Sequence, residues 1–253
     1  MTVTVVNVLD VAPLDHEEAM DLADVELARL LAAVDRLEDD DWTRPTDCQG
    51  WDVRAMLGHL LGMFELQADP ADRARQITTA AEQAARDGGL RLDAMTALQV
   101  REHAHLSVVE LRAALHEAVP RGLAARRAVP PQARATPFDP QLPGVSGWTV
   151  GYLFDVIHTR DPWLHRVDLS RATGAQLVLT AEHDGRIVAD VVAEWARAHG
   201  EPFELVLTGP AGGAFVAGPG SDPAPIVLDA VEFCRVLSGR APGTGLLAHR
   251  VVF

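Results

Sequence analysis

The chain has 253 residues, 48% hydrophobic and 23% charged, a composition typical of a globular protein with one large core or two smaller ones. Its formal net charge of -14 disfavours nucleic acid or an anionic membrane as a partner, because phosphates are bound by clustered positive charge. The cysteines, Cys48 and Cys234, are far apart, which excludes a disulfide framework or a cysteine zinc site and favours a reduced, cytoplasmic location.

The chain begins with a short segment followed by a long helix. Residues 1–10 lack a charged stretch followed by a long apolar run, so we expect no signal peptide. No stretch approaches the length of a membrane span. Residues 15–37 place apolar side chains at helical spacing, with acidic side chains concentrated at the start, which predicts the first helix.

Helical periodicity continues beyond this first helix. A loop rich in turn residues, 43–50, leads into a second helix that begins near Asp52 and carries His59 between apolar positions. The pattern over 69–119 is again helical, with a break at a pair of glycines.

A long connection separates these helices from a fourth. Residues 120–143 are rich in Pro, Arg and Ala, which predicts an irregular connection. The fourth helix is expected over 147–168, with a kink at Pro162 because proline removes a backbone donor. Four helices with polar groups directed inward from two of them indicate a helix bundle with a site in its core.

The last part of the chain changes to a mixed pattern. Helices are predicted over 181–199 and 229–237, and strands over 203–208, 214–217, 225–228 and 246–253. The glycine-rich turn after the first strand has no P-loop lysine and precedes another strand, so we interpret it as a hairpin turn. The whole predicts a two-domain α+β fold, with a four-helix bundle over 1–172 and a small mixed α/β domain over 173–253.

Three side chains form a candidate metal site. Asp161 and His165 are four residues apart and share one face of a helix, and His59 is the best candidate for a third ligand. Imidazole nitrogens with a carboxylate oxygen suit zinc or another divalent transition metal, and three protein ligands leave one position open. Other interpretations stay open, because Asp161 before Pro162 is also typical of a helix N-cap and both histidines could be structural.

Three segments carry a family resemblance. They are Trp42-Thr-Arg-Pro-Thr-Asp-Cys-Gln-Gly-Trp51-Asp-Val-Arg-Ala-Met-Leu-Gly-His59-Leu, Arg160-Asp-Pro-Trp-Leu-His165-Arg-Val-Asp168 and Asp229-Ala-Val-Glu-Phe-Cys-Arg-Val-Leu-Ser-Gly-Arg240. With them the chain resembles the mycothiol-dependent maleylpyruvate isomerase-like family. That resemblance implies a DinB-like four-helix bundle followed by a C-terminal module similar to sterol-carrier folds.

The resemblance also implies roles for particular residues. The family's metal ligands fall on His59, Asp161 and His165, with aspartate where the characterised isomerase has glutamate. The shorter side chain would hold the metal closer to its own helix, admit an extra water or weaken binding. A family arginine thought to steer substrate carboxylates corresponds to Arg240, which could instead be an exposed arginine favoured at a helix C-terminus.

A thiol mechanism follows from the same comparison. Because neither cysteine is expected beside the ligands, the reacting thiol would come from outside, and the resemblance names mycothiol as the cosubstrate. A metal-bound thiolate would add to an electrophilic carbon, and the product would be an isomer or an S-conjugate, which makes the protein an isomerase or a thiol S-transferase. His158 could serve as a proton shuttle or be an ordinary helix residue.

A second class of function remains open. The protein could be a non-catalytic binding protein, with a structural or vestigial metal site and an apolar ligand in the C-terminal module. For the enzyme, the expected partners are a small-molecule electrophile and a low-molecular-weight thiol, without nucleic acid or membrane. We expect a monomer or a homodimer.

Overall fold

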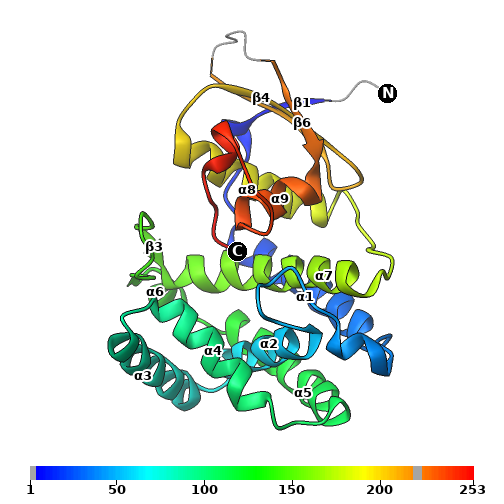
Figure 1. Ribbon diagram of the computed structural model, residues 1–253. Coiled ribbons are helices and arrows are strands. Elements are labelled where there is room, and N and C mark those ends of the chain that lie inside the picture. Colours follow the sequence, from blue (N-terminus) through cyan, green and yellow to red (C-terminus); the bar gives the residue numbers. More distant parts are fainter. Residues whose placement is uncertain (1–3, 219–223) are drawn as a thin grey trace. The chain divides into compact units, whose positions relative to one another are not determined.

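The computed structural model describes residues 4–218 and 224–253, and the chain divides into two compact units (Figure 1). The helical unit is Asp15–Ala175, and the other unit combines the segment ending at Leu14 with Gln176–Phe253. Residues 4–14, which are predicted to belong to the helical domain, lie in the unit that contains the sheet. The two-domain α+β fold class is confirmed.

The helical unit contains helices of very different length. In chain order they are α1 (His16–Val34), η2 (Asp39–Thr43), α2 (Val53–Ala68), α3 (Pro70–Asp87), α4 (Arg91–His103), α5 (Val108–Arg127), α6 (Pro131–Arg134), the π-helical segment η3 (Tyr152–Ile157) and α7 (His158–Thr173). Two short strands, β2 (Pro137–Phe138) and β3 (Trp148–Thr149), pair antiparallel before η3.

Side-chain caps fix where the long helices begin. The carboxylates of Asp15, Asp52 and Asp69 accept hydrogen bonds from first-turn backbone N–H groups of α1, α2 and α3. Ser107 and Glu110 form a capping box at the start of α5. At the other end of α7, Gly174 has a φ of +73°, a left-handed conformation that glycine adopts without strain and that ends the helix.

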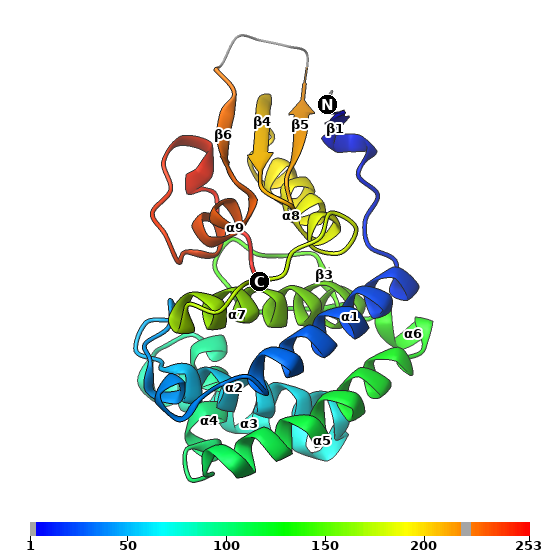
Figure 2. The ribbon, with the colours of Figure 1, turned by 90° about the vertical axis from the view of Figure 1, so that its right-hand side faces the viewer.

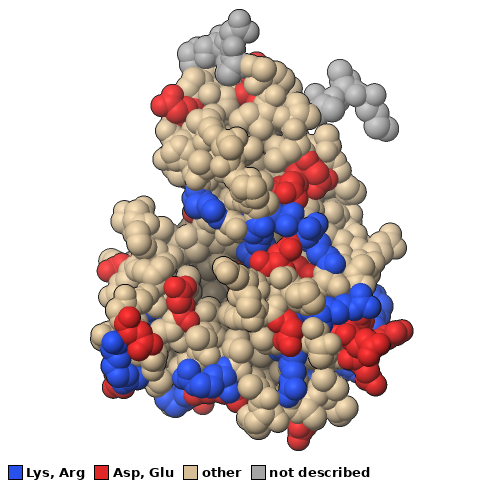
Figure 3. Space-filling model, in the orientation of Figure 1, with Lys and Arg blue, Asp and Glu red and all other residues tan. Residues whose placement is uncertain are grey.

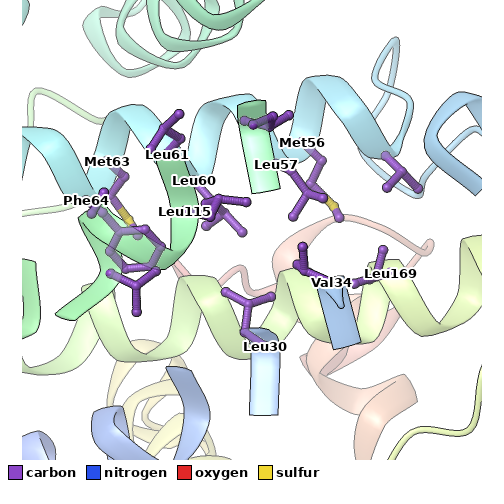
Figure 4. Close-up of a cluster of buried hydrophobic side chains, with 14 of the residues drawn as sticks. Leu30, Val34, Met56, Leu57, Leu60, Leu61, Met63, Phe64, Leu115 and Leu169 are labelled. Atoms are coloured by element: carbon purple, nitrogen blue, oxygen red, sulfur yellow. The ribbon is translucent and has the colours of Figure 1, made fainter. Parts of the chain in front are cut away.

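The core of this unit lies where α1, α2, α5 and α7 meet (Figure 4). Leu30 of α1, Leu60 and Phe64 of α2, Leu115 of α5 and Leu169 of α7 are each at most 2% exposed. Burying one such side chain stabilises the fold by about 1.5–3 kcal/mol. These are the helices of the predicted bundle, and they place α2 and α7, which carry the candidate ligands, in one packed body.

The middle of the bundle differs from the prediction in two respects. The helical pattern over 69–119 belongs to three helices, because α3 and α4 pack beside α2 before α5 begins. The irregular connection expected over 120–143 is wrong in its first part, since α5 continues through Pro120 to Arg127, and only the short α6 and β2 interrupt the rest. Packing explains the difference: Gly122 lies so close to α2 that a Cβ there would be 3.1 Å from the Phe64 carbonyl oxygen. This tertiary contact outweighs the poor helix propensity of proline.

Helix α7 passes through Pro162 without ending. Ile157 occupies its N-cap position, so Asp161 lies inside the helix and does not cap it. A buried bidentate ion pair ties α7 to α1, with Arg166 Nε 2.6 Å from Glu26 Oε1 and Arg166 Nη2 2.9 Å from Glu26 Oε2. The pair fixes the rotation of α7 and therefore the direction of the side chains on its ligand face.

The second unit is built on a mixed sheet. Its elements are β1 (Val5–Asn7), η1 (Val8–Asp10), α8 (Asp184–His199), β4 (Phe203–Thr208), β5 (Gly213–Ala217), β6 (Ile226–Asp229), α9 (Ala230–Ser238) and η4 (Gly245–Ala248). The strand order is β1-β5-β4-β6, with β4 antiparallel to β5 and parallel to β6 (Figure 2). Alternate residues of β4 are buried, so one face of the sheet packs against α8 and α9.

One predicted strand is absent from this sheet, and an unpredicted strand is present. Residues 246–253 form η4 and an irregular tail, whose Val251 N–H donates to the Leu237 carbonyl at the end of α9. The available sheet edge is instead occupied by β1, with Val6 paired in parallel to Phe215. The predicted hairpin turn after β4 is confirmed by the antiparallel β4–β5 register.

Charged side chains of both signs lie next to one another on the face shown in Figure 3. In the helical unit, Arg75 has its Nη atoms 2.6 Å from Asp72 Oδ1 and 2.6 Å from Glu102 Oε1. Among the described residues, no helix is both long and apolar enough to cross a membrane.

Candidate metal centre

Two helices bring the three predicted ligands together. His59 lies in α2, and Asp161 and His165 lie one turn apart in α7. His165 Nε2 is 3.3 Å from Asp161 Oδ1, and His59 Nε2 is 3.7 Å from Asp161 Oδ2. Potential ligand atoms of the three side chains all lie within 4.8 Å of one another. Both imidazoles thus present Nε2 to one carboxylate.

Burial and one carboxylate oxygen without a hydrogen bond make this cluster a candidate cation site. His59 is 7% exposed and His165 is 3% exposed. Asp161 Oδ2 is buried and has no hydrogen-bond partner among the residues that the structure describes. A buried carboxylate oxygen without a partner is costly, because it has lost water without a replacement. Two imidazole nitrogens and this oxygen match the donor set of zinc and other divalent transition metals.

Each imidazole has a partner on its other nitrogen. His165 Nδ1 is 3.0 Å from Asp168 Oδ2, and His59 Nδ1 is 2.7 Å from Gln99 Oε1 of α4. An acceptor at Nδ1 places the ring proton there and leaves the Nε2 lone pair available for a metal. Such partners also hold the ring orientation, so the arrangement is ready to bind a cation.

The protonation of the cluster reflects its close packing. Burial alone would raise the pKa of Asp161, but the adjacent His165 and His59 hold it well below its usual range. Burial would likewise lower the pKa of His165, but Asp161, Asp168 and Cys48 raise it well above its usual value. The Asp161 carboxylate and the His165 imidazole are therefore coupled, because each favours the charged form of the other.

The structure corrects one expectation about the cysteines. Cys48 Sγ lies 3.4 Å from Asp168 Oδ2 and 3.8 Å from His165 Nδ1, so a cysteine does lie beside a proposed ligand. The loop between Trp42 and α2 brings it there, which sequence distance did not reveal. The sulfur faces the Nδ1 side of His165, whereas Nε2 faces Asp161.

Other residues of the site were missed by the sequence analysis. The Trp51 ring lies 5.2 Å from the His59 ring and 6.4 Å from the His165 ring, centroid to centroid, and forms an aromatic wall. Asp168 follows His165 by three positions, so helical spacing could have identified it. Gln99 carries no comparable signal, since it comes from a helix remote in sequence from α2.

His158 lies in a different environment. It is 8% exposed, and its Nδ1 is 3.1 Å from Gln67 Nε2. Burial, with a smaller contribution from Arg126, lowers the pKa of His158 to about 3. Its imidazole is therefore neutral near pH 7 and accepts a hydrogen bond from Gln67. These contacts favour the structural role that the sequence analysis weighed against a proton shuttle.

Arg240 belongs to the other unit. It follows Gly239, which ends α9 with a φ of +91°, and the Arg240 N–H donates to the Arg235 carbonyl. Its assignment as a residue that steers substrate carboxylates remains a prediction.

The fold and the site together define a helix-bundle protein with a candidate two-histidine, one-carboxylate metal site. A family model described as mycothiol maleylpyruvate isomerase N-terminal domain matches residues 23–170, which include all three candidate ligands. The chain belongs to this family.

Individual relatives are more distant. Two uncharacterized proteins of Mycobacterium tuberculosis, from strains CDC 1551 / Oshkosh and ATCC 25618 / H37Rv, are each 27% identical over 83% of this chain and 80% of their own length. The crystal structure of the mycothiol-dependent maleylpyruvate isomerase has a TM-score of 0.60 at 17% identity, covering 94% of this chain and 93% of that one. A histidine-to-alanine mutant of that isomerase gives the same TM-score at 16% identity. These structures confirm the fold.

Proposed function

We propose that the protein is a metal- and mycothiol-dependent enzyme that adds a thiolate to a small electrophile, either as an isomerase or as a thiol S-transferase. The observation that carries the proposal is the convergence of two imidazole Nε2 atoms on the Asp161 carboxylate, whose Oδ2 has no hydrogen-bond partner among the described residues. Membership of the family supports the choice of thiol. A divalent metal at this site, with zinc as first choice, supplies thiolate near neutral pH by lowering the pKa of a coordinated thiol.

The chain's own residues have separable roles in this proposal. His59, Asp161 and His165 hold the cation, and three protein ligands leave a coordination position for an external sulfur. The Trp51 ring packs beside both imidazoles and supports their orientation. Cys48 approaches Nδ1 of His165, so it is not directed at the ligand atoms facing Asp161. We assign Arg240 to substrate carboxylates, and Arg240→Met should raise KM for a carboxylate substrate more than it lowers kcat.

Metal analysis tests the cation site. We expect about one equivalent of divalent metal in the purified protein and almost none in a His59→Ala, His165→Ala double variant. Glu110→Gln, which changes an exposed carboxylate in the α5 cap, serves as the control and should retain the metal. Equal, near-zero content in all three proteins would refute the site.

Thiol binding and product analysis test the chemistry. Cobalt-substituted protein titrated with mycothiol should develop a sulfur-to-metal charge-transfer band, and no change at millimolar thiol would contradict the proposal. Incubation with maleylpyruvate and other electrophiles then distinguishes isomers from S-conjugates. Retained apolar ligand in mass spectrometry, without any effect of thiol, would instead favour the binding-protein function.

A further inference from the structure

Two buried glutamines lie behind His59 and connect it to acceptors on α2 and α3. Gln99 is 2% exposed and Gln76 is 0% exposed. Gln99 Oε1 is 2.7 Å from His59 Nδ1, and Gln99 Nε2 donates to Gln76 Oε1 at 3.0 Å. Gln76 Nε2 then donates to the Gly62 carbonyl oxygen at 3.0 Å and to Asp72 Oδ2 at 2.7 Å.

The last two acceptors determine the direction of every hydrogen bond in this series. A backbone carbonyl oxygen cannot donate, and a carboxylate such as that of Asp72, which also accepts from Arg75 at 2.6 Å, offers only acceptor oxygens. Gln76 must therefore direct its NH₂ group at them, which leaves its Oε1 to accept from Gln99. Gln99 consequently directs its own Oε1 at His59, where it accepts the Nδ1–H.

From this geometry we propose that Gln76 and Gln99 are positioning residues that select the Nδ1–H tautomer of His59 and so prepare its Nε2 for a metal. The inference rests on the proposed metal site. The opposite orientation of both amides would place acceptors against acceptors at Gly62 and Asp72, inside the protein. The chain thus uses a neutral amide behind one imidazole and the Asp168 carboxylate behind the other.

The two linked side-chain amides of Gln76 and Gln99, here called the amide relay, fit between α2 and α4 because of a glycine. A Cβ at Gly62 would lie 2.6 Å from Gln99 Cγ and 2.8 Å from Gln99 Cβ. The Gln99 side chain therefore crosses α2 at a residue that has no side chain. The same Gly62 supplies the carbonyl oxygen that accepts from Gln76. One glycine thus provides both the space and one end of the relay.

The first test reads the tautomer directly and needs no metal. Two-bond ¹H–¹⁵N correlation spectra of metal-free protein with ¹⁵N-labelled histidine should show His59 protonated at Nδ1. A neutral His59 protonated at Nε2 would overturn the proposal. Because this measurement is independent of metal binding, a protein that binds no metal would refute the proposed function and leave the relay open to confirmation.

The second test compares metal affinity by competition with a chromophoric chelator, using zinc and cobalt. Gln99→Leu should weaken binding about 10- to 100-fold, the usual effect of removing a partner of a ligand histidine. Gln99→Glu still offers an oxygen to Nδ1–H but loses the donor to Gln76 Oε1, so it should restore only part of that affinity. Gln67→Leu is the matched control, because this buried amide contacts His158, and it should bind as the wild type does. Wild-type affinity in Gln99→Leu, or equal losses in Gln99→Leu and Gln99→Glu, would overturn the proposal. If Gln99→Leu does not fold, the ¹H–¹⁵N spectrum of the wild-type protein alone tests the proposal, because it shows which nitrogen of His59 carries the proton.

Discussion

Arg126 Nη1 donates a hydrogen bond to the backbone carbonyl oxygen of His158 at 3.0 Å, across the interface between α5 and α7. That carbonyl would normally accept from the residue four positions later, which is Pro162 and has no N–H. Arg126 Nη2 also donates to Thr159 Oγ1 at 2.8 Å. Arg126, itself 1% exposed, thus replaces the donor that proline removes and allows α7 to continue to Asp161 and His165.

Removing this donor should destabilise the bundle. Arg126→Met keeps much of the buried volume but leaves the His158 carbonyl without a partner, so the free energy of unfolding should fall by about 1–3 kcal/mol. Urea denaturation measures the change. In a Pro162→Ala background the helix supplies its own N–H, and the same substitution should cost less. Arg121→Met, at an exposed position of α5, is the control, and equal losses at both arginines would contradict this account.

Gly62→Ala should disturb the metal centre without touching a ligand. In most helix interiors this change stabilises by about 0.5–1 kcal/mol. Here the new methyl group would meet Gln99 Cβ at 2.8 Å, so Gln99 must move away from His59. We expect about 10-fold weaker metal binding, measured by chelator competition. Gly58→Ala, one turn earlier, would meet His103 Cβ at 3.3 Å and should have the smaller effect on affinity.

The pH dependence of stability should contain a contribution from His103 and Glu65. His103 Nε2 lies 3.0 Å from Glu65 Oε2, and its Nδ1 lies 2.7 Å from the Gln99 carbonyl. Burial would lower the pKa of His103, but these two acceptors raise it above 6.5. Since the folded-state pKa is the higher one, the stabilisation is complete below the unfolded value and is lost as pH rises through the folded value. Glu65→Gln should therefore lower the free energy of unfolding most at pH values below the folded-state pKa of His103. Urea denaturation at pH values on both sides of that pKa measures the loss. A loss that does not vary with pH would exclude the ion pair as its source.

The bundle and the juxtaposition of Asp161 with His165 could be predicted from sequence because they depend on local spacing. The Asp161–His165 pair is visible as a four-residue interval, and α1 and α2 follow apolar periodicity and Asp caps. The continuation of α5 through Pro120 could not be predicted in this way, because it depends on packing against another helix.

The residues that contact the candidate ligands were harder to predict from sequence than the candidate ligands themselves. Gln99 reaches His59 only because α4 lies on α2, and Cys48 reaches His165 only because a loop folds over α7. The N-terminal strand β1 pairs with β5, a partner near the opposite end of the chain. In each case a contact between remote segments decides the outcome, and periodicity within one segment contains no information about it.

Cys48 provides a test of whether the reacting thiol is external. Its sulfur lies against Asp168 and the Nδ1 side of His165, so the proposed mechanism does not use it as the nucleophile. Cys48→Ser retains a hydroxyl donor for Asp168 and should keep both metal binding and mycothiol-dependent turnover within about 10-fold of wild type. Asp168→Asn, in contrast, changes the partner of His165 Nδ1 and should weaken metal binding about 10- to 100-fold. Steady-state assays with and without mycothiol, on protein of known metal content, measure both effects. Turnover that persists without added thiol and disappears in Cys48→Ser would instead make this cysteine the nucleophile.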